Sequence, residues 1–136
     1  MNALVVINPN SSQTVTDGID TAIDPLRSFG IPVRCLTLAE DPPGIESQQQ
    51  ADLTIAPMLK LAAAQKDAAD YVIACFGDPG LHALRDQTSL PVVGIQEASV
   101  MTALTLGHKF GVIAILPASI PRHLRAFGAM GVSGRL

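Results

Sequence analysis

One cysteine follows an apolar run and is followed at once by a glycine-rich turn. The run YVIACF spans residues 71–76, and the turn GDPG comes directly after it. Glycines in such a turn let backbone N–H groups approach a ligand, because no Cβ stands in the way. A helix expected to begin near Pro79 would point its positive end at the same place. These features favour a Cys75 thiolate with a pKa below the usual value of about 8.5, suited to act as a nucleophile or an acid–base. A small buried core residue is the other interpretation.

Polar side chains follow two other expected strands. The segment NPNSS contains Asn8, Asn10, Ser11 and Ser12. These residues could cap the next helix, and they could also orient a polar substrate. Glu97 follows the run PVVGI. It could orient or charge the same site, or simply stabilise the N-terminus of a helix.

The other residues with ligand-type side chains indicate no second site. Cys35 lies inside the run VRCLTL, where core packing is the expected role. His82, His108 and His123 are scattered, and each is expected to be a surface histidine or one whose hydrogen bonds are satisfied. Neither a C-x-x-C nor an H-x-x-x-H spacing occurs, so no metal site is expected.

The composition is that of an apolar single domain. The chain has 136 residues, of which 48% are hydrophobic and 15% charged, with a net charge of −3. Average proteins carry about 25% charged residues. The shortage of charge indicates apolar surface meant for a partner, so we expect a homo-oligomer. The chain has no basic run, no apolar stretch near 18 residues and no signal-peptide pattern. We therefore expect a cytoplasmic protein that binds neither nucleic acid nor membranes.

Apolar strands alternate with helices along the whole sequence. Strands are expected over 3–8, 33–39, 71–76, 91–95 and 110–116, and helices over 12–29, 47–66, 80–87, 96–106 and 118–129. Pro25 should kink or shorten the first helix. This alternation predicts an α/β fold: a three-layer, flavodoxin-like parallel sheet of four to five strands flanked by helices, as a single domain over 1–136. Ligands of such folds bind beyond the carboxyl ends of the strands, where the polar and cysteine loops meet.

Four motifs occur in order over nearly the whole chain: INPNSS at 7–12, CFGDPGL at 75–81, PVVGIQEAS at 91–99 and FGVIAI at 110–115. Together they resemble the hydantoin and allantoin racemases of the aspartate/glutamate racemase superfamily. The resemblance implies proton transfer, without a cofactor, at the carbon alpha to a carbonyl of a small-molecule substrate. Two cysteines on opposite faces of the substrate carry out this transfer in the family, in a cleft between two domains.

The resemblance also implies roles for individual residues. Cys75 matches the first cysteine of the family and would be the catalytic acid–base. Asn10, with Ser11 beside it, matches a part of the family that holds the substrate. The turn after the cysteine matches another such part, formed by Phe76, Gly77, Asp78, Pro79 and Gly80.

The sequence departs from the family pattern in two places. The second cysteine, which belongs to a G-C-A-G-like motif in the later half of the family, does not occur in these 136 residues. Ala114 and Ile115 stand where family members usually carry threonines. The chain thus resembles the N-terminal half of a racemase, with a site that could be incomplete. The alternatives are a catalytically silent remnant that binds small molecules or oligomerises, and a relative of decarboxylases that needs one thiol.

Overall fold

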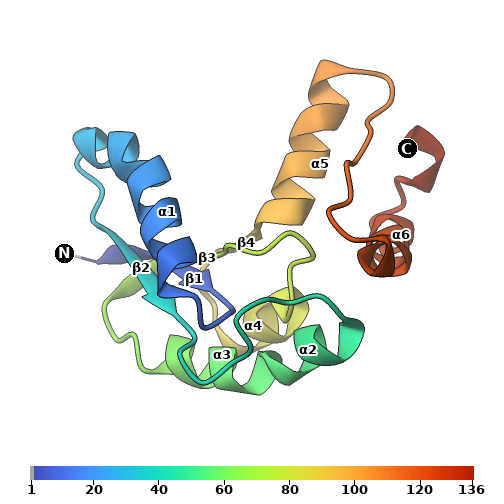
Figure 1. The fold of residues 1–136 in the computed structure, drawn as a ribbon. Coiled ribbons are helices and arrows are strands. Elements are labelled where there is room, and N and C mark those ends of the chain that lie inside the picture. The colour runs from blue at the N-terminus through green and yellow to red at the C-terminus, as the bar shows by residue number, and fades with distance from the viewer. Residues whose placement is uncertain (1) are drawn as a thin grey trace.

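A four-stranded parallel sheet forms the centre of the protein in the computed structural model, which describes residues 2–136. The strand order is β2-β1-β3-β4. The strands are β1 (Ala3–Asn8), β2 (Val33–Thr37), β3 (Ala68–Ile73) and β4 (Val92–Gly94). This order is that of a flavodoxin-like sheet without its fifth strand. The expected α/β class and the four strands are confirmed (Figure 1).

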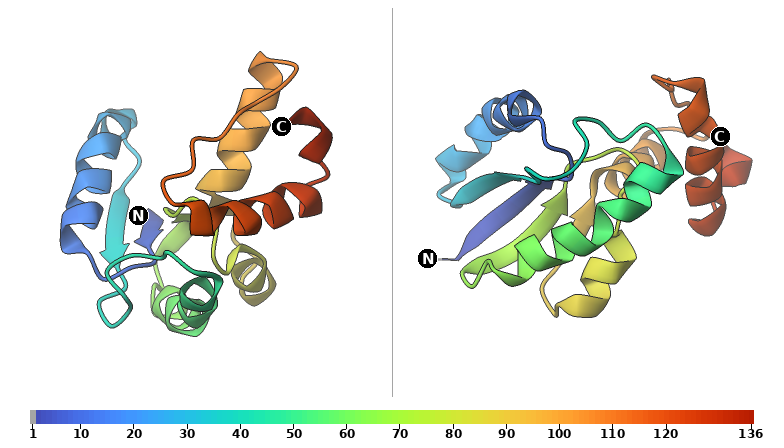
Figure 2. Two further views of the ribbon diagram at one scale, coloured as in Figure 1. Left: turned by 45° about the vertical axis from the view of Figure 1, so that its right-hand side comes forward. Right: turned by 60° about the horizontal axis from the view of Figure 1, so that its bottom comes forward.

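Helices cover both faces of this sheet (Figures 1 and 2). On one face lies α1 (Gln13–Ile23), which continues into the 3-10 helix η1 (Asp24–Phe29). On the other face lie α3 (Ile55–Ala63) and α4 (Leu81–Gln87), and α2 (Gln48–Leu53) precedes α3. Beyond β4 come α5 (Ile95–Leu106), η2 (Pro117–Ser119), α6 (Ile120–Ala129) and η3 (Ser133–Arg135). Within residues 2–136, no helix has both the length and the apolar character needed to cross a membrane.

Two prolines shorten the expected helices. Pro25 ends the α-helical part of the first helix at Ile23, and a 3-10 helix continues from there. The expected single helix over 47–66 is instead two helices that meet at Thr54. A proline ring collides with the carbonyl four residues earlier in a continuous helix, and for Pro57 that residue is Leu53, the last residue of α2.

The main core lies where α3 and α4 pack against the sheet. Its fully buried side chains include Ile7 of β1, Met58 of α3, Ile73 of β3 and Leu84 of α4. The Tyr71 hydroxyl donates to the Ala62 carbonyl at 2.9 Å, so the polar end of this buried ring is satisfied.

The expected fifth strand, residues 110–116, is wrong. This segment lies between α5 and α6 and pairs with no strand among residues 2–136. Phe110 and Val112 pack into a small second core around Val100, Phe127 and Val132, whereas Ile113 and Ile115 are 98% and 94% exposed. The segment has the apolar, β-branched composition of a strand, but a strand also needs a neighbour for its backbone.

Candidate functional site

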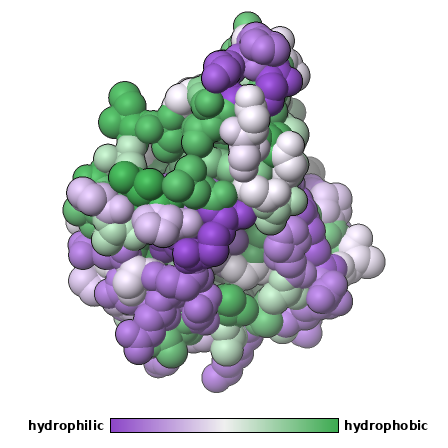
Figure 3. All heavy atoms as spheres, turned by 90° about the vertical axis from the view of Figure 1, so that its right-hand side faces the viewer, coloured by the Kyte–Doolittle hydropathy of each residue, from purple (hydrophilic) through white to green (hydrophobic). Residues whose placement is uncertain are grey.

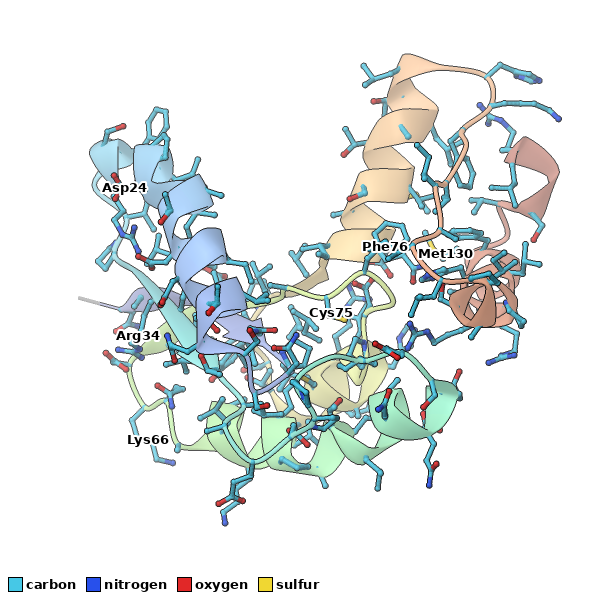
Figure 4. All side chains as sticks on the ribbon, in the orientation of Figure 1. Asp24, Arg34, Lys66, Cys75, Phe76 and Met130 are labelled. Carbon is cyan, nitrogen blue, oxygen red and sulfur yellow. The ribbon has the colours of Figure 1, made fainter. Side chains whose placement is uncertain are left out.

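The loop after β3 carries Cys75 two residues beyond the end of the strand. The Ala74 N–H donates to the Ile7 carbonyl at 2.8 Å, and the Asp78 N–H donates to the Cys75 carbonyl at 2.9 Å. The second of these bonds closes a turn over residues 75–78, and a bond from the Leu81 N–H to the Asp78 carbonyl at 3.2 Å closes the next turn. In this loop Gly77, Asp78 and Gly80 have φ values of +131°, +46° and +75°. At Gly80, a Cβ would lie 2.5 Å from the Met58 Cε, so only glycine fits without movement. The thiol is thereby held at the carboxyl edge of the sheet (Figure 4).

Asp78 ties this loop to the start of α5. Its Oδ1 accepts from the Gln96 N–H and its Oδ2 from the Glu97 N–H, both at 2.8 Å. A Cβ at Gly94 would collide with the Asp78 carboxyl group, so only glycine fits at the residue before α5. Burial raises the pKa of Asp78, although the two N–H donors act in the opposite direction. Both carboxylate oxygens are thus engaged by backbone groups.

A pocket of about 560 Å³ opens beside the thiol. Cys75 and Phe76 form one side, and Arg122 and His123 of α6 form another. The remaining lining comes from the extended segment 111–116, from Ser119, and from Ile45 and Glu46 in the loop before α2. The volume lies within the range of small-molecule sites, roughly 300–1,000 Å³. Most of the lining is apolar, and Arg122 and Glu46 are its charged side chains.

Burial raises the pKa of the Cys75 thiol to about 11. The positive charge of Arg122 acts to lower this pKa, and the Asp78 carboxylate acts to raise it. The expectation of a lowered pKa is therefore wrong, because protein atoms displace water around the sulfur and Asp78 opposes Arg122. At neutral pH, Cys75 is a thiol that is able to donate a proton.

Arg122 is a cation that lies against the cysteine loop. A Cβ at Gly77 would lie 3.7 Å from both the Cζ and the Nε of Arg122, so the guanidinium rests against the loop backbone. One of its amino groups donates to the Ser47 carbonyl at 3.3 Å. Among residues 2–136, Arg122 forms no salt bridge, and its Nε is buried without a partner. Its charge therefore remains available to act on the pocket.

His123 is held in a fixed orientation next to Arg122. Its Nδ1 lies 2.9 Å from the side-chain Nε2 of Gln96, and both side chains are buried. Phe76 meets the imidazole edge-on, with ring centroids 5.2 Å apart, and Phe127 stacks on it at 6.4 Å. Burial, together with the positive charge of Arg122, lowers the pKa of His123, so its ring is neutral at pH 7.

The other residues expected at the site lie outside the pocket lining. The Asn10 Oδ1 accepts from the Asn8 side chain and from the Ser12 N–H, each at 2.9 Å, and the Ser11 N–H donates to Pro42. Pro79 is buried. Glu97 forms a salt bridge with Arg85 at 2.8 Å, and this contact lowers the pKa of the Glu97 carboxyl. A role in substrate binding for these residues, and for Gly77, Asp78 and Gly80, stays a prediction.

Cys35 lies in a different part of the sheet. It is half-buried in β2, and β1 separates this strand from β3. Burial, together with a hydrogen bond to Asp20 of α1, raises its pKa to about 11. It does not line the pocket, as expected. Among residues 2–136, no three His, Cys, Asp or Glu side chains come together in a way that could hold a metal ion.

Gln96 lies in the motif PVVGIQEAS, at the edge of the sheet where the site was expected. Sequence analysis did not identify Arg122 and His123 as parts of this site, because they come from α6, more than forty residues after Cys75, and belong to none of the four motifs. His123 in particular was expected on the surface or with its hydrogen bonds satisfied, and it is buried and faces the pocket. Only the path of the chain after α5 brings these side chains to the cysteine.

Comparison with known proteins supports the resemblance seen in the motifs. The profile of the Asp/Glu/hydantoin racemase family matches residues 4–136. A hydantoin racemase from Pseudomonas sp. (strain NS671) is 38% identical over 114 residues, which are 82% of this chain and 46% of that protein. A hydantoin racemase from Paenarthrobacter aurescens is 32% identical over 124 residues, which are 89% of this chain and 52% of that protein.

Solved structures show the same fold. Allantoin racemase from Klebsiella pneumoniae has a TM-score of 0.92 and 27% identity, over 99% of this chain and 56% of that one. Allantoin racemase from Pseudomonas fluorescens has a TM-score of 0.91 and 25% identity, over 98% of this chain and 57% of that one. This chain spans about half the length of the relatives that it matches. On these similarities of sequence and fold, the chain belongs to the Asp/Glu/hydantoin racemase family.

Proposed function

We propose that this protein is a racemase-type domain in which Cys75 transfers a proton at the carbon alpha to a carbonyl. The observation that carries the proposal is the position of the Cys75 thiol, which lines a pocket of about 560 Å³ at the carboxyl edge of the sheet. The family includes a hydantoin racemase with which the chain shares 38% identity over 114 residues. No cofactor is needed for this chemistry, because a thiolate that accepts the proton and a hydrogen-bonded carbonyl are sufficient for the transfer.

The proposed substrate is a 5-substituted hydantoin, an allantoin or a related amino acid derivative. The pocket offers Phe76, Val112 and Leu116 for an apolar substituent. The proton-abstraction step uses the thiolate form of Cys75, which the positive charge of Arg122 favours. In this step the C5–H bond breaks and the proton moves to the Cys75 thiolate, which becomes a neutral thiol. The electron pair of that bond moves onto the neighbouring carbonyl oxygen and gives an enolate. Arg122, the cation of the pocket, favours this negative charge.

Inversion of the carbon needs a proton from the opposite face. Cys35 cannot supply it, because it lies on β2 against Asp20 and outside the pocket. We therefore propose that residues 1–136 hold one half of the acid–base pair. One thiol is sufficient to remove and return a proton on the same face, which exchanges hydrogen without changing the configuration.

The experiment is hydrogen exchange at C5 of L-5-benzylhydantoin in D₂O, followed by ¹H NMR, with optical rotation recorded on the same sample. The proposal predicts that deuterium enters C5 faster than in buffer alone while optical rotation persists. Cys75→Ala should remove this gain, and the matched control Cys35→Ala should keep it. Exchange that survives Cys75→Ala would contradict the role of Cys75. Racemisation that depends on Cys75 would keep the function but show that a second donor is present.

A second candidate function is self-association through the segment 110–116. The observation that favours it is the exposure of Ile113 and Ile115 on a segment with no strand partner among residues 2–136. Figure 3 shows apolar side chains gathered on the face of the molecule that carries α5 and α6. A second copy of the chain could cover this surface, and the mass in solution tests the idea.

A further inference from the structure

His123 is a buried imidazole whose tautomer is set by its neighbour. The Gln96 Nε2 lies 2.9 Å from the His123 Nδ1. An amide NH₂ group can only donate, so Nδ1 has to accept. A neutral imidazole with an accepting Nδ1 carries its proton on Nε2. His123 therefore has one N–H donor that Gln96 does not use.

This donor belongs to a side chain that lines the pocket of Cys75. Within residues 2–136 the His123 Nε2 forms no hydrogen bond, and it is not one of the fully buried polar atoms without a partner. The Nε2–H is therefore accessible to a ligand bound in the pocket. Phe76, the residue after Cys75, meets the imidazole edge-on at 5.2 Å, and Phe127 stacks on it at 6.4 Å. The orientation of the donor is therefore fixed before any ligand binds.

We propose that the Nε2–H of His123 donates a hydrogen bond to the substrate carbonyl next to the carbon that Cys75 deprotonates, and that Gln96 is the positioning residue that sets this tautomer. The inference deepens the proposed function and rests on it. In a hydantoin this carbonyl is C4=O, beside C5. Its oxygen gains negative charge as the C5–H bond breaks, so a fixed donor there stabilises the transition state more than the ground state.

The surroundings favour a neutral donor over a charged one. Arg122 precedes His123, and its guanidinium charge disfavours a second cation beside it. Glu46 is the carboxylate in the pocket lining, and no salt bridge joins it to His123. The pocket thus combines one neutral N–H donor with one nearby positive charge, which suits a neutral cyclic ureide whose oxygen becomes anionic during reaction.

The first test is protection of Cys75 from iodoacetamide by L-5-benzylhydantoin at pH 9, with Cys35 as the internal reference in the same mass spectrum. His123→Phe keeps the aromatic contacts and removes the donor. Loss of one uncharged hydrogen bond weakens binding roughly three- to tenfold, so the half-protecting concentration should rise by that factor. Gln96→Leu should raise the half-protecting concentration less, because in a fraction of the molecules His123 still adopts the Nε2–H tautomer. His82→Gln, at an exposed position on α4, is the matched control and should change nothing.

The second test reads the tautomer directly in the unmodified protein. The ¹⁵N-histidine NMR spectrum at pH 8 should show His123 as the Nε2–H tautomer, and the hydantoin should shift its Nε2 resonance. Gln96→Leu should give a mixture of tautomers in a protein that keeps its circular dichroism spectrum. An Nδ1–H tautomer in the wild-type protein would overturn the inference, whatever the variants do.

The outcomes separate this inference from the proposed function. Equal protection of Cys75 in wild type and His123→Phe would overturn the role of His123 and leave the proposed function standing. No protection in wild type, at any concentration up to saturation, would overturn the proposed function and the inference together. Protection that weakens in His123→Phe and not in His82→Gln supports both.

Discussion

Residues 3–94 and residues 95–136 differ in how completely each buries its own apolar side chains. The first region closes a continuous core between the sheet and its helices, with Ile7, Ile73 and Leu84 fully buried. The second region has a small core around Phe127. It leaves Ile113 and Ile115 almost fully exposed on a segment without strand pairing. The first region is therefore stabilised by its own core. The second region buries few apolar side chains of its own, so its stability depends on its contacts with the first region.

The pocket lies at the junction of these two regions. The first region contributes Cys75 and Phe76, and the second contributes Arg122, His123 and the segment 111–116. Specific contacts link the two regions at this junction. Asp78 accepts from the backbone at the start of α5, and Arg85 pairs with Glu97. Arg122 donates to the Ser47 carbonyl, and Phe76 meets His123 edge-on. The geometry of the pocket around Cys75 thus depends on how the second region is held against the first.

The largest expected effect is a truncation in the core of the first region. Leu84→Ala removes a fully buried side chain of α4, so it should lower the free energy of unfolding by roughly 2–5 kcal/mol. The measurement is urea unfolding followed by far-UV circular dichroism. The matched control is Leu106→Ala at the end of α5, where the side chain is 84% exposed and a change under about 0.5 kcal/mol is expected. Equal losses for the two variants would contradict the placement of Leu84 in the core and of Leu106 on the surface.

The next largest effect is expected on self-association through the exposed side chains of Ile113 and Ile115 in the second region. Ile113→Lys combined with Ile115→Lys should weaken self-association roughly 10²–10³-fold, because two apolar side chains would no longer be buried and two charges would oppose each other. Sedimentation velocity over a range of protein concentrations measures this change. Phe29→Lys, at a 77% exposed apolar position of the first region, should leave association unchanged. A wild-type protein that stays monomeric at every concentration would contradict the prediction.

The same contrast explains what the sequence could predict about the fold. The strands of the first region were predicted to within a few residues, because apolar runs bounded by turns specify buried parallel strands. The run 110–116 has the same composition, but whether it forms a strand depends on a neighbour that is not encoded in the segment itself. The break at Thr54 depends on Pro57, whose steric effect lies four residues earlier in the chain.

The candidate site divides in a similar way. Cys75 and Phe76 could be found because they lie in a local pattern of strand, glycines and turn. Asp78 was placed in the right loop, yet its carboxylate is used to hold α5. Arg122 and His123 could not be found, since only the packing of α6 against the loop brings them to the thiol.

A third prediction concerns the hydrogen bonds by which Asp78 links the first region to α5. Asp78→Ala leaves two N–H groups at the start of α5 without their acceptor, so the free energy of unfolding should fall by roughly 1–3 kcal/mol. Asp78→Asn should cost less, because the amide keeps one acceptor oxygen and asparagine tolerates the positive φ of this position. Urea unfolding gives both values, and hydrogen exchange at the start of α5 shows where the loss occurs. A smaller loss for alanine than for asparagine would contradict the assigned role.

The smallest expected effect is a change in the alkylation rates of the two thiols, Cys75 and Cys35. Burial raises the pKa of each to about 11, but their neighbours act in opposite directions: Arg122 lowers the pKa of Cys75, and Asp20 raises that of Cys35. Arg122→Gln should therefore raise the pKa of Cys75 and slow its alkylation at pH 9, whereas Asp20→Asn should lower the pKa of Cys35 and speed its alkylation. A change of roughly two- to tenfold in rate is expected for one neighbouring charge. In both variants the other thiol is the control, because it lies on a different strand of the sheet. If Arg122→Gln instead speeds the reaction of Cys75, the arginine acts as a steric cover of the pocket and not as the charge that favours the thiolate.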